Sequence, residues 1–361
     1  MSSTLVVPVV EVKDVREHPN ANTLELCTVL GYQMVIRKGE YKSGDKAVYF
    51  PADTLLSTEL IEAHNLSNFL KGPDNNRVGC IRLRGQNSFG LVLKLPEIVE
   101  HNTVGDNVAD LLGCQKYQPP VRATCGDAAP FDPEIDVFIH RYTDIENGRI
   151  FTDVFSPEDD VVVTEKIHGS NVKLVYIPGK GFFAGSTGFR RKQPLGNNGE
   201  LIPIGDKNML SSTYWAPYAI CPKLAEMMES ISNKHNTVIV YGEIFGSMVQ
   251  NMHYGAKGKY GFRVFDISVN GEYMNFYDMV YFCDIYEVNI VPILFQGKFD
   301  FDVVDELSDG PSTLDSSHIR EGVVVKTIME DHDVCIGRKI LKYIGNSYLM
   351  GKKDSDDNTD V

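Results

Sequence analysis

Short apolar runs with turn residues between them fill the first third of the chain. They are VVPVVEVKDV, LELCTVL, QMVIRKG, KAVYFPA, RVGCIRLRG and FGLVLKLP, and Gly, Pro and Asn residues punctuate them. Closely spaced strands of this kind are typical of small β-barrels and sandwiches. We predict a small barrel over residues 1–116, and an OB-like barrel is the preferred version.

The pattern becomes irregular after this segment. The stretch YQPPVRATCGDAAPFDPEI contains four prolines, which block regular structure: Pro119, Pro120, Pro130 and Pro133. We therefore place a linker at residues 117–135 and a second domain at residues 136–350. The final residues, 351–361, are polar and acidic, and we predict a disordered tail there.

Strands alternate with a few helices in the second domain. VVVTEK and VKLVYI have the apolar, β-branched character of neighbouring strands, and Asn270-Gly271 is a strong hairpin signal between two apolar stretches. PKLAEMMESIS places apolar residues on one helical face, and YDMVYFCDIY predicts a second helix. This order favours an α+β domain built on antiparallel sheets.

Net charge and cysteine content limit how the chain can bind nucleic acid and which cellular compartment fits it. The 361 residues include 35 Lys plus Arg against 49 Asp plus Glu, a net charge of −14, so any nucleic-acid partner must be held by a focused basic groove. Seven scattered cysteines without a C-x-x-C pair favour a reduced intracellular compartment, and either cytoplasm or nucleus fits. No apolar run is long enough to cross a bilayer, so we expect no membrane partner.

One strand ends in an unusual way. The run VVVTEK finishes on Glu165 and Lys166, side chains that rarely enter a core unpaired, and HGSN follows, where Gly169 permits a tight turn. A lysine in a cleft becomes a nucleophile when burial or nearby cations lower its pKa. A lysine at a strand end is by itself more often a solvated surface residue.

Three further strands end in or contain charged residues. They are VIVYGEIFG with Glu243, REGVVVKT with Glu321 and Lys326, and GRKILKYIG with Lys342. Carboxylates at positions 243 and 321 are suited to a hard divalent cation, and the lysines are suited to phosphate oxygens. Together with Lys166, this set predicts a shared cleft for nucleotidyl transfer.

The same segments resemble a known family. EKIHGSN, YGEIFG, GFRVFDI, EGVVVK and ILKYIGNSYL occur in the order found in ATP-dependent RNA ligases of the nick-sealing type, which belong to the covalent nucleotidyltransferase superfamily. The first domain is similar to the OB-like, RNA-binding domain that one branch of these ligases carries. The resemblance implies ATP and Mg²⁺ or Mn²⁺ as cofactors and RNA, at a duplex nick or a break, as substrate. We expect a monomer.

The resemblance also implies a role for each residue. Lys166 attacks the α-phosphate of ATP and forms lysyl-AMP, AMP passes to an RNA 5′-phosphate, and a 3′-OH closes the strand. The implied catalytic residues are Lys166, His168, Asn171, Glu243, Glu321, Lys326 and Lys342, with Glu243 and Glu321 at the metal. The implied nucleotide-binding residues are Glu165, Lys166, Gly169, Arg190, Glu243, Phe262, Lys326 and Lys342. Among these, Phe262 is expected to stack on adenine and Glu165 to contact the nucleoside.

The chain departs from the family pattern in two places. Such ligases carry an arginine in a segment that matches FAGSTGFRRK, where this chain has Ser186, so Arg190 or Arg191 is the expected substitute. The last motif commonly has a second lysine where Ile344 stands, and Lys339 is the candidate replacement.

Spacing within EGVVVK raises a separate question. Glu321 and Lys326 lie an odd number of residues apart, so a regular strand would point them to opposite faces. Gly322 resolves this if Glu321 stays in the preceding turn.

Two other functions compete with this interpretation. A DNA ligase or an mRNA-capping guanylyltransferase shares the lysyl-nucleotide step, although those families usually have Asp at the position of His168 and follow the last motif with a further OB domain. A non-catalytic RNA-binding protein is the second alternative. The histidines His18, His64, His101, His140, His235, His253, His318 and His332 show no metal-ligand spacing, and we expect surface or packing roles for them.

Overall fold

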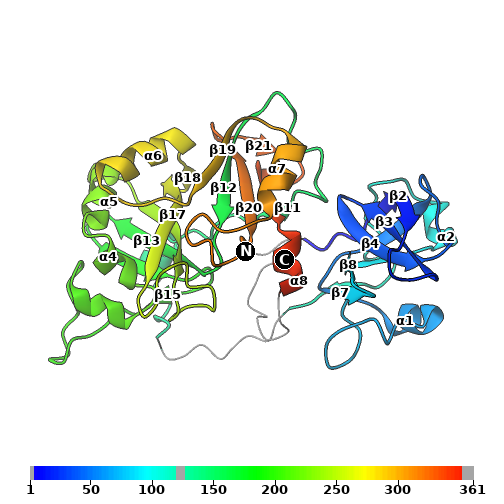
Figure 1. Ribbon diagram of the computed structural model, residues 1–361. Coiled ribbons are helices and arrows are strands. Elements are labelled where there is room, and N and C mark those ends of the chain that lie inside the picture. Colours follow the sequence, from blue (N-terminus) through cyan, green and yellow to red (C-terminus); the bar gives the residue numbers. More distant parts are fainter. Residues whose placement is uncertain (1–3, 119–126, 352–361) are drawn as a thin grey trace. The chain divides into compact units, whose positions relative to one another are not determined.

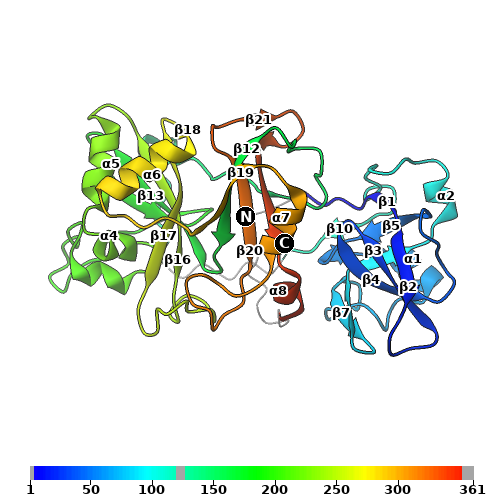
Figure 2. The ribbon, with the colours of Figure 1, turned by 45° about the horizontal axis from the view of Figure 1, so that its top comes forward.

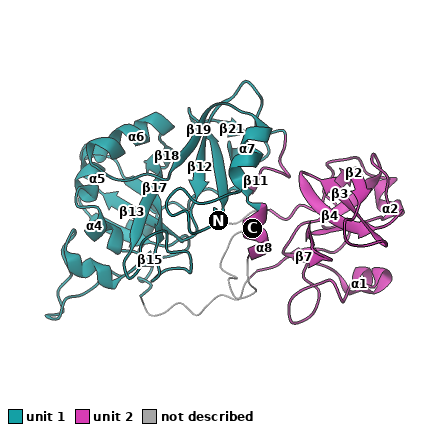
Figure 3. Cartoon of the chain, in the orientation of Figure 1, with its two compact units in different colours: residues 1, 121–145, 153–345 teal, residues 2–120, 146–152, 346–361 magenta. Residues whose placement is uncertain are grey.

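A computed structural model describes residues 4–118 and 127–351 of the chain. The chain forms two compact units (Figure 3): unit 1 contains residues 1, 121–145 and 153–345, and unit 2 contains residues 2–120, 146–152 and 346–361. Most of the predicted acidic tail and part of the predicted proline-rich linker lie outside the described residues. The domain bounds 1–116 and 136–350 stay a prediction.

Unit 2 consists mainly of short antiparallel strands. Its strands are β1 (Val9–Glu11), β2 (Lys13–Glu17), β3 (Leu24–Val29), β4 (Tyr32–Arg37), β5 (Lys46–Phe50), β6 (Thr54–Leu55), β7 (Cys80–Leu83), β8 (Gln86–Phe89), β9 (Leu91–Leu93), β10 (Gln115–Lys116) and β11 (Glu146–Asn147). Its helices are α1 (Thr58–His64), α2 (Pro96–Val99) and α8 (Asn346–Gly351).

The apolar positions of these strands form the core of unit 2. Its two three-stranded sheets have the orders β1-β5-β9 and β2-β3-β4. Buried apolar residues come from both sheets, and Val48, Phe50 and Met34 are at most 1% exposed. Helix α8 packs here as well, because Leu349 and Met350 contact the cluster that contains Met34. The predicted small β-barrel over the first third of the chain therefore has a buried apolar interior of its own.

Unit 1 contains two larger sheets and most of the helices (Figure 1). Its strands are β12 (Asp160–Lys166), β13 (Ser170–Ile177), β14 (Gly181–Gly185), β15 (Arg190–Arg191), β16 (Val238–Phe245), β17 (Gly261–Val269), β18 (Glu272–Tyr273), β19 (Ile293–Lys298), β20 (Gly322–Thr327), β21 (His332–Asp333), β22 (Gly337–Arg338) and β23 (Ile340–Ile344). Its helices are α3 (Pro133–Asp136), the 3₁₀ helix η1 (Lys207–Ser211), α4 (Ala216–Ile220), α5 (Leu224–Ser232), α6 (Phe276–Ile285) and α7 (Phe301–Ser308).

The first sheet of unit 1 is six-stranded and antiparallel, with the order β15-β14-β13-β16-β17-β18. Helices α4, α5 and α6 cover one of its faces (Figures 1 and 2). Alternate residues of β13, β16 and β17 pack against these helices, around the fully buried Trp215, Met227 and Met279. Side chains on the other face of the sheet are therefore available for a site.

The second sheet of unit 1 contains antiparallel strands in the order β23-β20-β12-β19. Valines 161–163 at its centre are completely buried, which explains their continuous apolar run. Helix α7 contacts β20 and β23. The second apolar cluster of unit 1 joins Ile340 of this sheet to Val175 and Ile239 of the six-stranded sheet, so the two sheets pack together.

Several sequence predictions are confirmed in unit 1. Both predicted helices form, as α5 and α6, and Asn270 and Gly271 connect β17 to β18 with positive φ angles of 51° and 93°. The α+β class with antiparallel sheets is also confirmed. Within the described ranges, no helix has the length and apolar character needed to cross a membrane.

Candidate active site

A cavity opens between the two sheets of unit 1. Its lining includes Lys166 of β12, Glu243 of β16, Phe265 of β17, and Val324 and Lys326 of β20. The enclosed part measures about 40 Å³, which is room for a few water molecules, and the space including its open mouth is about 450 Å³.

Strand register brings the three predicted lysines to one face of the second sheet. Lys166 pairs with Gly322 across the β12–β20 ladder, and Lys326 pairs with Val162. Lys342 of β23 pairs with Val324, which in turn pairs with position 164. Directly opposed residues share a face, and so do residues an even number apart on one strand. The three amines therefore extend from the same side of the sheet.

A short ion pair in the site joins Lys166 to Glu321. The Lys166 Nζ donates to Glu321 Oε1 at 2.5 Å, and the two side chains are 11% and 1% exposed. Glu321 directly precedes β20, so it escapes the strand alternation that would separate it from Lys326. A Cβ on Gly322 would lie 2.2 Å from the Tyr343 carbonyl oxygen, so only glycine fits there. The predicted role of Gly322 therefore agrees with the structure.

The second carboxylate, Glu243, lies near the end of β16 and lines the same cavity. Burial raises the pKa of Glu243 from 4.5 to about 8; the Lys166 charge opposes this effect and the Glu321 charge adds to it. Gly169 supports the carboxyl through its backbone N–H. A Cβ on Gly169 would lie 2.3 Å from the Ile244 carbonyl oxygen, so Gly169 is needed for the close approach of the turn to β16.

The segment after Lys166 places two further predicted residues at the site. His168 is 5% exposed, its Nδ1 lies 3.7 Å from Glu321 Oε2, and its backbone N–H donates to the Tyr254 hydroxyl at 3.0 Å. Asn171 pairs with Glu243 across the β13–β16 ladder, so both extend from the same face. Both polar atoms of the Asn171 amide are buried without a hydrogen-bond partner among the described residues. Such a group is costly unless a ligand completes its bonds.

Glu165, the residue before the predicted nucleophile, is held by hydrogen bonds to a distant part of the chain. Its carboxylate accepts hydrogen bonds from the Ser312 hydroxyl at 2.5 Å and from the Thr313 N–H and hydroxyl at 2.9 and 2.5 Å, and Arg320 lies 3.7 Å away. Strand alternation points Glu165 away from the face of Lys166. The side chain therefore anchors the segment before β20. Glu165 also belongs to the lining of the cavity, and its contact with the nucleoside stays a prediction.

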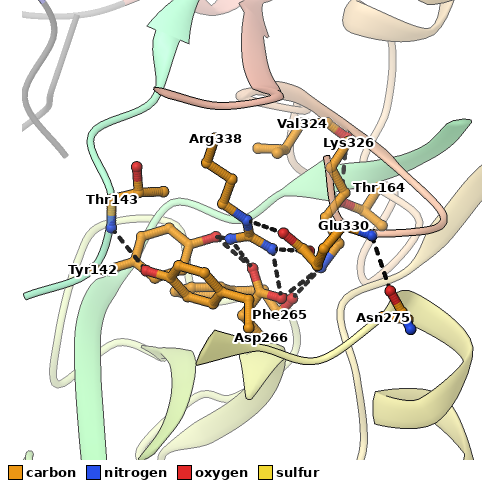
Figure 4. A network of polar contacts seen from close by, with 11 residues as sticks. Tyr142, Thr143, Thr164, Phe265, Asp266, Asn275, Val324, Lys326, Glu330 and Arg338 are labelled. Carbon is orange, nitrogen blue, oxygen red and sulfur yellow. Dashed lines mark hydrogen bonds and ion pairs between the residues drawn. The ribbon is translucent and has the colours of Figure 1, made fainter. Parts of the chain in front are cut away.

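Two residues of the cavity lining, Asp266 and Lys326, belong to a buried network of ion pairs and hydrogen bonds (Figure 4). Asp266 accepts from Lys326 Nζ at 2.6 Å, from the Tyr142 hydroxyl at 2.5 Å and from the Arg338 guanidinium at 2.7 Å. Arg338 also donates to Glu330 at 2.7 Å. Burial by itself would raise the pKa of Asp266, but the charges of Arg338 and Lys326 outweigh burial and lower this pKa to about 2. Burial lowers the pKa of Lys326.

The predicted adenine-stacking residue, Phe262, lies elsewhere. It is 1% exposed and packs in the cluster under the helices. A bulge shifts the register between Tyr241 and Gly242, so that Asp266 pairs with Tyr241 while Val264 pairs with Gly242. The unpaired residue between them, Phe265, lines the cavity together with Asp266. The phenylalanine on the cavity side is therefore Phe265, which lines the cavity together with Tyr142, and this corrects the residue chosen from the sequence.

Arg190 does not line the cavity either. Its Nε donates to Asp136 Oδ1 at 2.9 Å and its Nη2 to the Pro130 carbonyl at 2.8 Å, so the guanidinium joins β15 to α3. Lys339 also points elsewhere, because its Nζ lies 2.8 Å from Asp159 Oδ2. Neither residue fills the position that the sequence comparison assigned to it.

Lys173 was missed by the sequence analysis. It lies two residues after Asn171 on β13 and therefore extends from the same face. The side chain is buried, and its Nζ donates to the Thr187 carbonyl at 3.2 Å, in the loop that contains Ser186. Burial, together with the charge of Arg141, lowers the pKa of Lys173 to about 8, and the charge of Asp136 opposes this shift. A charged residue inside the run VKLVY was the available signal.

Comparisons with known proteins agree with this geometry. Residues 159–344 match the family model for RNA ligase, and residues 6–95 match an OB-fold domain model. A search of curated proteins gives no match.

Three similar solved structures are of Naegleria gruberi RNA ligase. A mutant with AMP and Mn has 25% identity and a TM-score of 0.71, covering 97% of this chain and 99% of that one. Another mutant with ATP and Mn has 25% identity and a TM-score of 0.69, covering 97% and 100%. The ligase with PPi has 24% identity and a TM-score of 0.69, covering 97% and 99%. Because the RNA ligase model spans residues 159–344, just over half of the 361 residues, the chain belongs to the RNA ligase family.

Proposed function

We propose that this RNA ligase uses ATP and a divalent cation to join RNA 3′-OH and 5′-phosphate ends at nicks in duplexes, with Lys166 as the nucleophile. The observation that carries the proposal is the contact of the Lys166 amine with Glu321, at 2.5 Å, in a cavity that Glu243 also lines. The similar Naegleria structures hold ATP or AMP with Mn, which supports the same cofactors here.

The first step is a phosphoryl transfer to Lys166. The Nζ attacks the α-phosphorus of ATP, a nitrogen–phosphorus bond forms, the bond to the bridging oxygen of the β-phosphate breaks, and pyrophosphate leaves. An ammonium ion cannot attack, so the amine must first release a proton, and Glu321 Oε1 is the acceptor within hydrogen-bond distance. The partial burial of Lys166 excludes competing water from the nucleophile.

The two carboxylates fit a divalent cation. The pKa of Glu243, raised to about 8 by burial, indicates a buried carboxyl that lacks sufficient positive charge nearby. Glu321 Oε2 is buried and has no hydrogen-bond partner in the described part of the chain. Glu243 and Glu321 would therefore hold the ion, which when bound neutralises charge on the phosphate oxygens.

Residues in the cavity, such as Phe265 and Lys326, and further lysines on the neighbouring strands would bind the nucleotide. Phe265 offers a ring face on which a purine can stack, a contact that does not by itself select ATP over GTP. Lys326 and Lys342 extend from the same face as Lys166, where their charges favour phosphate oxygens. Lys173 supplies positive charge beside the loop of Ser186, where the family pattern has an arginine.

Asn171 and His168 serve the RNA steps in this proposal. AMP passes from Lys166 to the 5′-phosphate of one RNA end, and the 3′-OH of the other end then attacks that phosphate and releases AMP. The unpaired Asn171 amide can donate to a phosphate oxygen or accept from a hydroxyl. His168 lies next to Glu321 and can hold the RNA phosphate near the cation.

A sealing assay tests the substrate. Duplexes with one nick and a radiolabelled 5′-phosphate would carry either RNA or DNA on the 3′-OH side, and we expect faster sealing of the RNA form. Equal or faster sealing of the all-DNA nick would favour the DNA ligase alternative, and no sealing by a protein that labels itself with GTP would favour a capping guanylyltransferase. In the same assay, Lys166→Ala tests the nucleophile, and Lys207→Ala, which removes an exposed lysine, is its matched control.

The assembly state and the role of unit 2 also remain proposals. We expect the protein to act as a monomer and unit 2 to bind RNA. Light scattering with and without a nicked duplex measures the oligomeric state. Binding of the duplex by the intact chain, with and without charge reversal at Arg82 and Arg84, tests whether unit 2 binds RNA. If the RNA-binding module were the only active part, no covalent labelling would accompany duplex binding.

A further inference from the structure

Three side chains that the proposed reaction does not use meet in unit 1: His253, Asp315 and His318. One ligand atom from each lies within 4.8 Å of the others. Asp315 Oδ2 is 3.7 Å from His253 Nδ1 and 4.0 Å from His318 Nε2, and the two imidazole rings have centroids 4.4 Å apart. The sequence spacing does not reveal this cluster, because His253 lies far from the other two along the chain. The surface or packing roles expected for these histidines stay a prediction.

The carboxylate of Asp315 is held in one orientation. Its Oδ1 accepts from the backbone N–H and the hydroxyl of Ser317, at 3.0 and 2.7 Å. These bonds leave Oδ2 directed towards both imidazole rings. His318 Nε2 is buried and has no hydrogen-bond partner among the residues that the structure describes. The cluster thus contains one oriented carboxylate oxygen and one imidazole nitrogen that lacks a partner.

We propose that His253, Asp315 and His318 bind a transition-metal ion of the Zn²⁺ class, at a site separate from the cation at Glu243 and Glu321. Two imidazoles and one carboxylate suit Zn²⁺, Co²⁺ or Ni²⁺, whereas Mg²⁺ prefers oxygen ligands. Ligand atoms in a tetrahedral site with bonds of about 2.1 Å lie roughly 3.4 Å apart. The two carboxylate–imidazole separations of 3.7 and 4.0 Å, and a separation of at most 4.8 Å for the remaining pair, exceed this value by no more than about 1.4 Å, so side-chain rotations must close the site. A water molecule would take the fourth position.

One existing hydrogen bond limits the affinity. The Gly255 N–H donates to His253 Nδ1 at 3.0 Å, which fixes the ring but also occupies its lone pair. An ion at this nitrogen replaces that bond. We therefore expect weaker binding than in closed structural sites with four protein ligands.

The position of the cluster gives the ion a consequence for the proposed reaction. Tyr254 follows His253, and its hydroxyl accepts from the His168 N–H at 3.0 Å. Thr313, two residues before Asp315, donates to the Glu165 carboxylate at 2.9 Å. The ion would therefore join the loop of His253 to the loop of Asp315. One loop contacts His168 and the other contacts Glu165, and both of these residues lie within two positions of Lys166. The effect on ligation rests on the proposed function, but the binding itself does not.

Cobalt titration of the full chain without a histidine tag tests the site. With excess Mg²⁺ present to fill oxygen-rich sites, we expect one Co²⁺ per chain and visible absorption bands of a low-coordinate ion. His318→Gln and Asp315→Asn should each weaken Co²⁺ binding at least tenfold. His235→Gln, which changes an exposed histidine of the same unit, should bind like the wild type.

Glu243→Gln separates this proposal from the proposed function. It should keep the Co²⁺ bands even if it loses covalent labelling, because Glu243 is not a ligand of the cluster. Fluorescence of Trp215, the single tryptophan, checks that each variant is folded. Equal Co²⁺ affinity in the wild type, His318→Gln and Asp315→Asn would overturn the proposal, as would loss of the bands in Glu243→Gln alone or the absence of Co²⁺ binding in the folded wild type.

Discussion

Glu243 makes the stability of unit 1 depend on pH in the absence of a divalent cation. Burial raises the pKa of its carboxyl from 4.5 to about 8. Between these two pH values the folded protein holds a proton that the unfolded chain has released. Stability from this group is therefore greatest below pH 4.5 and declines as the pH rises through about 8. Glu243→Gln keeps the shape of the protonated side chain and removes this dependence.

The size of the effect follows from the pKa. A rise from 4.5 to about 8 corresponds to a free-energy difference of at most about 5 kcal/mol between the two protonation states. The carboxyl is buried but the residue as a whole keeps intermediate exposure, and solvent screening reduces the effective value. We expect the stability advantage of Glu243→Gln over the wild type to grow by on the order of 2 kcal/mol between pH 5 and pH 9.

Urea unfolding with EDTA present, followed by tryptophan fluorescence, measures this advantage. The single tryptophan, Trp215, is 1% exposed in the core of unit 1 and so reports on that unit. Glu229→Gln alters an exposed carboxyl on α5 and serves as the control without a pH-dependent difference. Mn²⁺ at pH 9 should stabilise the wild type but not Glu243→Gln. A difference that is constant from pH 5 to pH 9, or that shrinks, would refute the reasoning.

Three further predictions concern the same cavity. Asp266→Asn leaves the buried charges of Arg338 and Lys326 without their shared counter-charge, so we expect a loss of about 3–5 kcal/mol in unfolding free energy; a loss below about 1 kcal/mol would contradict the network's role. Phe265→Ala removes the proposed stacking surface and should raise the KM for ATP about tenfold in the labelling reaction, and an unchanged KM would exclude stacking there. Asn171→Ala should leave stability within about 1 kcal/mol, because its amide has no described partner, while sealing slows at least tenfold; normal sealing rates would remove Asn171 from the RNA steps.

Much of the site could be predicted because its residues interrupt strongly β-forming runs. Lys166, Glu243, Lys326 and Lys342 are charged residues in or at the ends of buried strands, and antiparallel register then places the lysines on one face. The sequence also indicated that Glu321 lies outside the regular strand, because the glycine that follows it signals a close approach of the backbone. The pattern of apolar and charged residues is therefore sufficient to predict site residues on regular strands.

The remaining features depend on tertiary structure that local pattern does not encode. The bulge opposite Tyr241 moves Phe265 rather than Phe262 to the cavity, and period-two alternation gives no sign of such an extra residue. Glu165 finds its hydrogen-bond partners far along the chain, at Ser312 and Thr313. Contacts of this kind come from the path of loops between strands, which spacing within a motif cannot specify.

Peptide mapping after incubation with ATP and Mn²⁺ tests whether Lys166 is the nucleophile. We expect one AMP group per chain, attached through an acid-labile phosphoramidate to Lys166, with no adduct in Lys166→Ala and normal labelling in Lys207→Ala. An adduct on another residue, such as Lys173, or the absence of any adduct in the folded wild type, would contradict the assignment of Lys166 as the nucleophile.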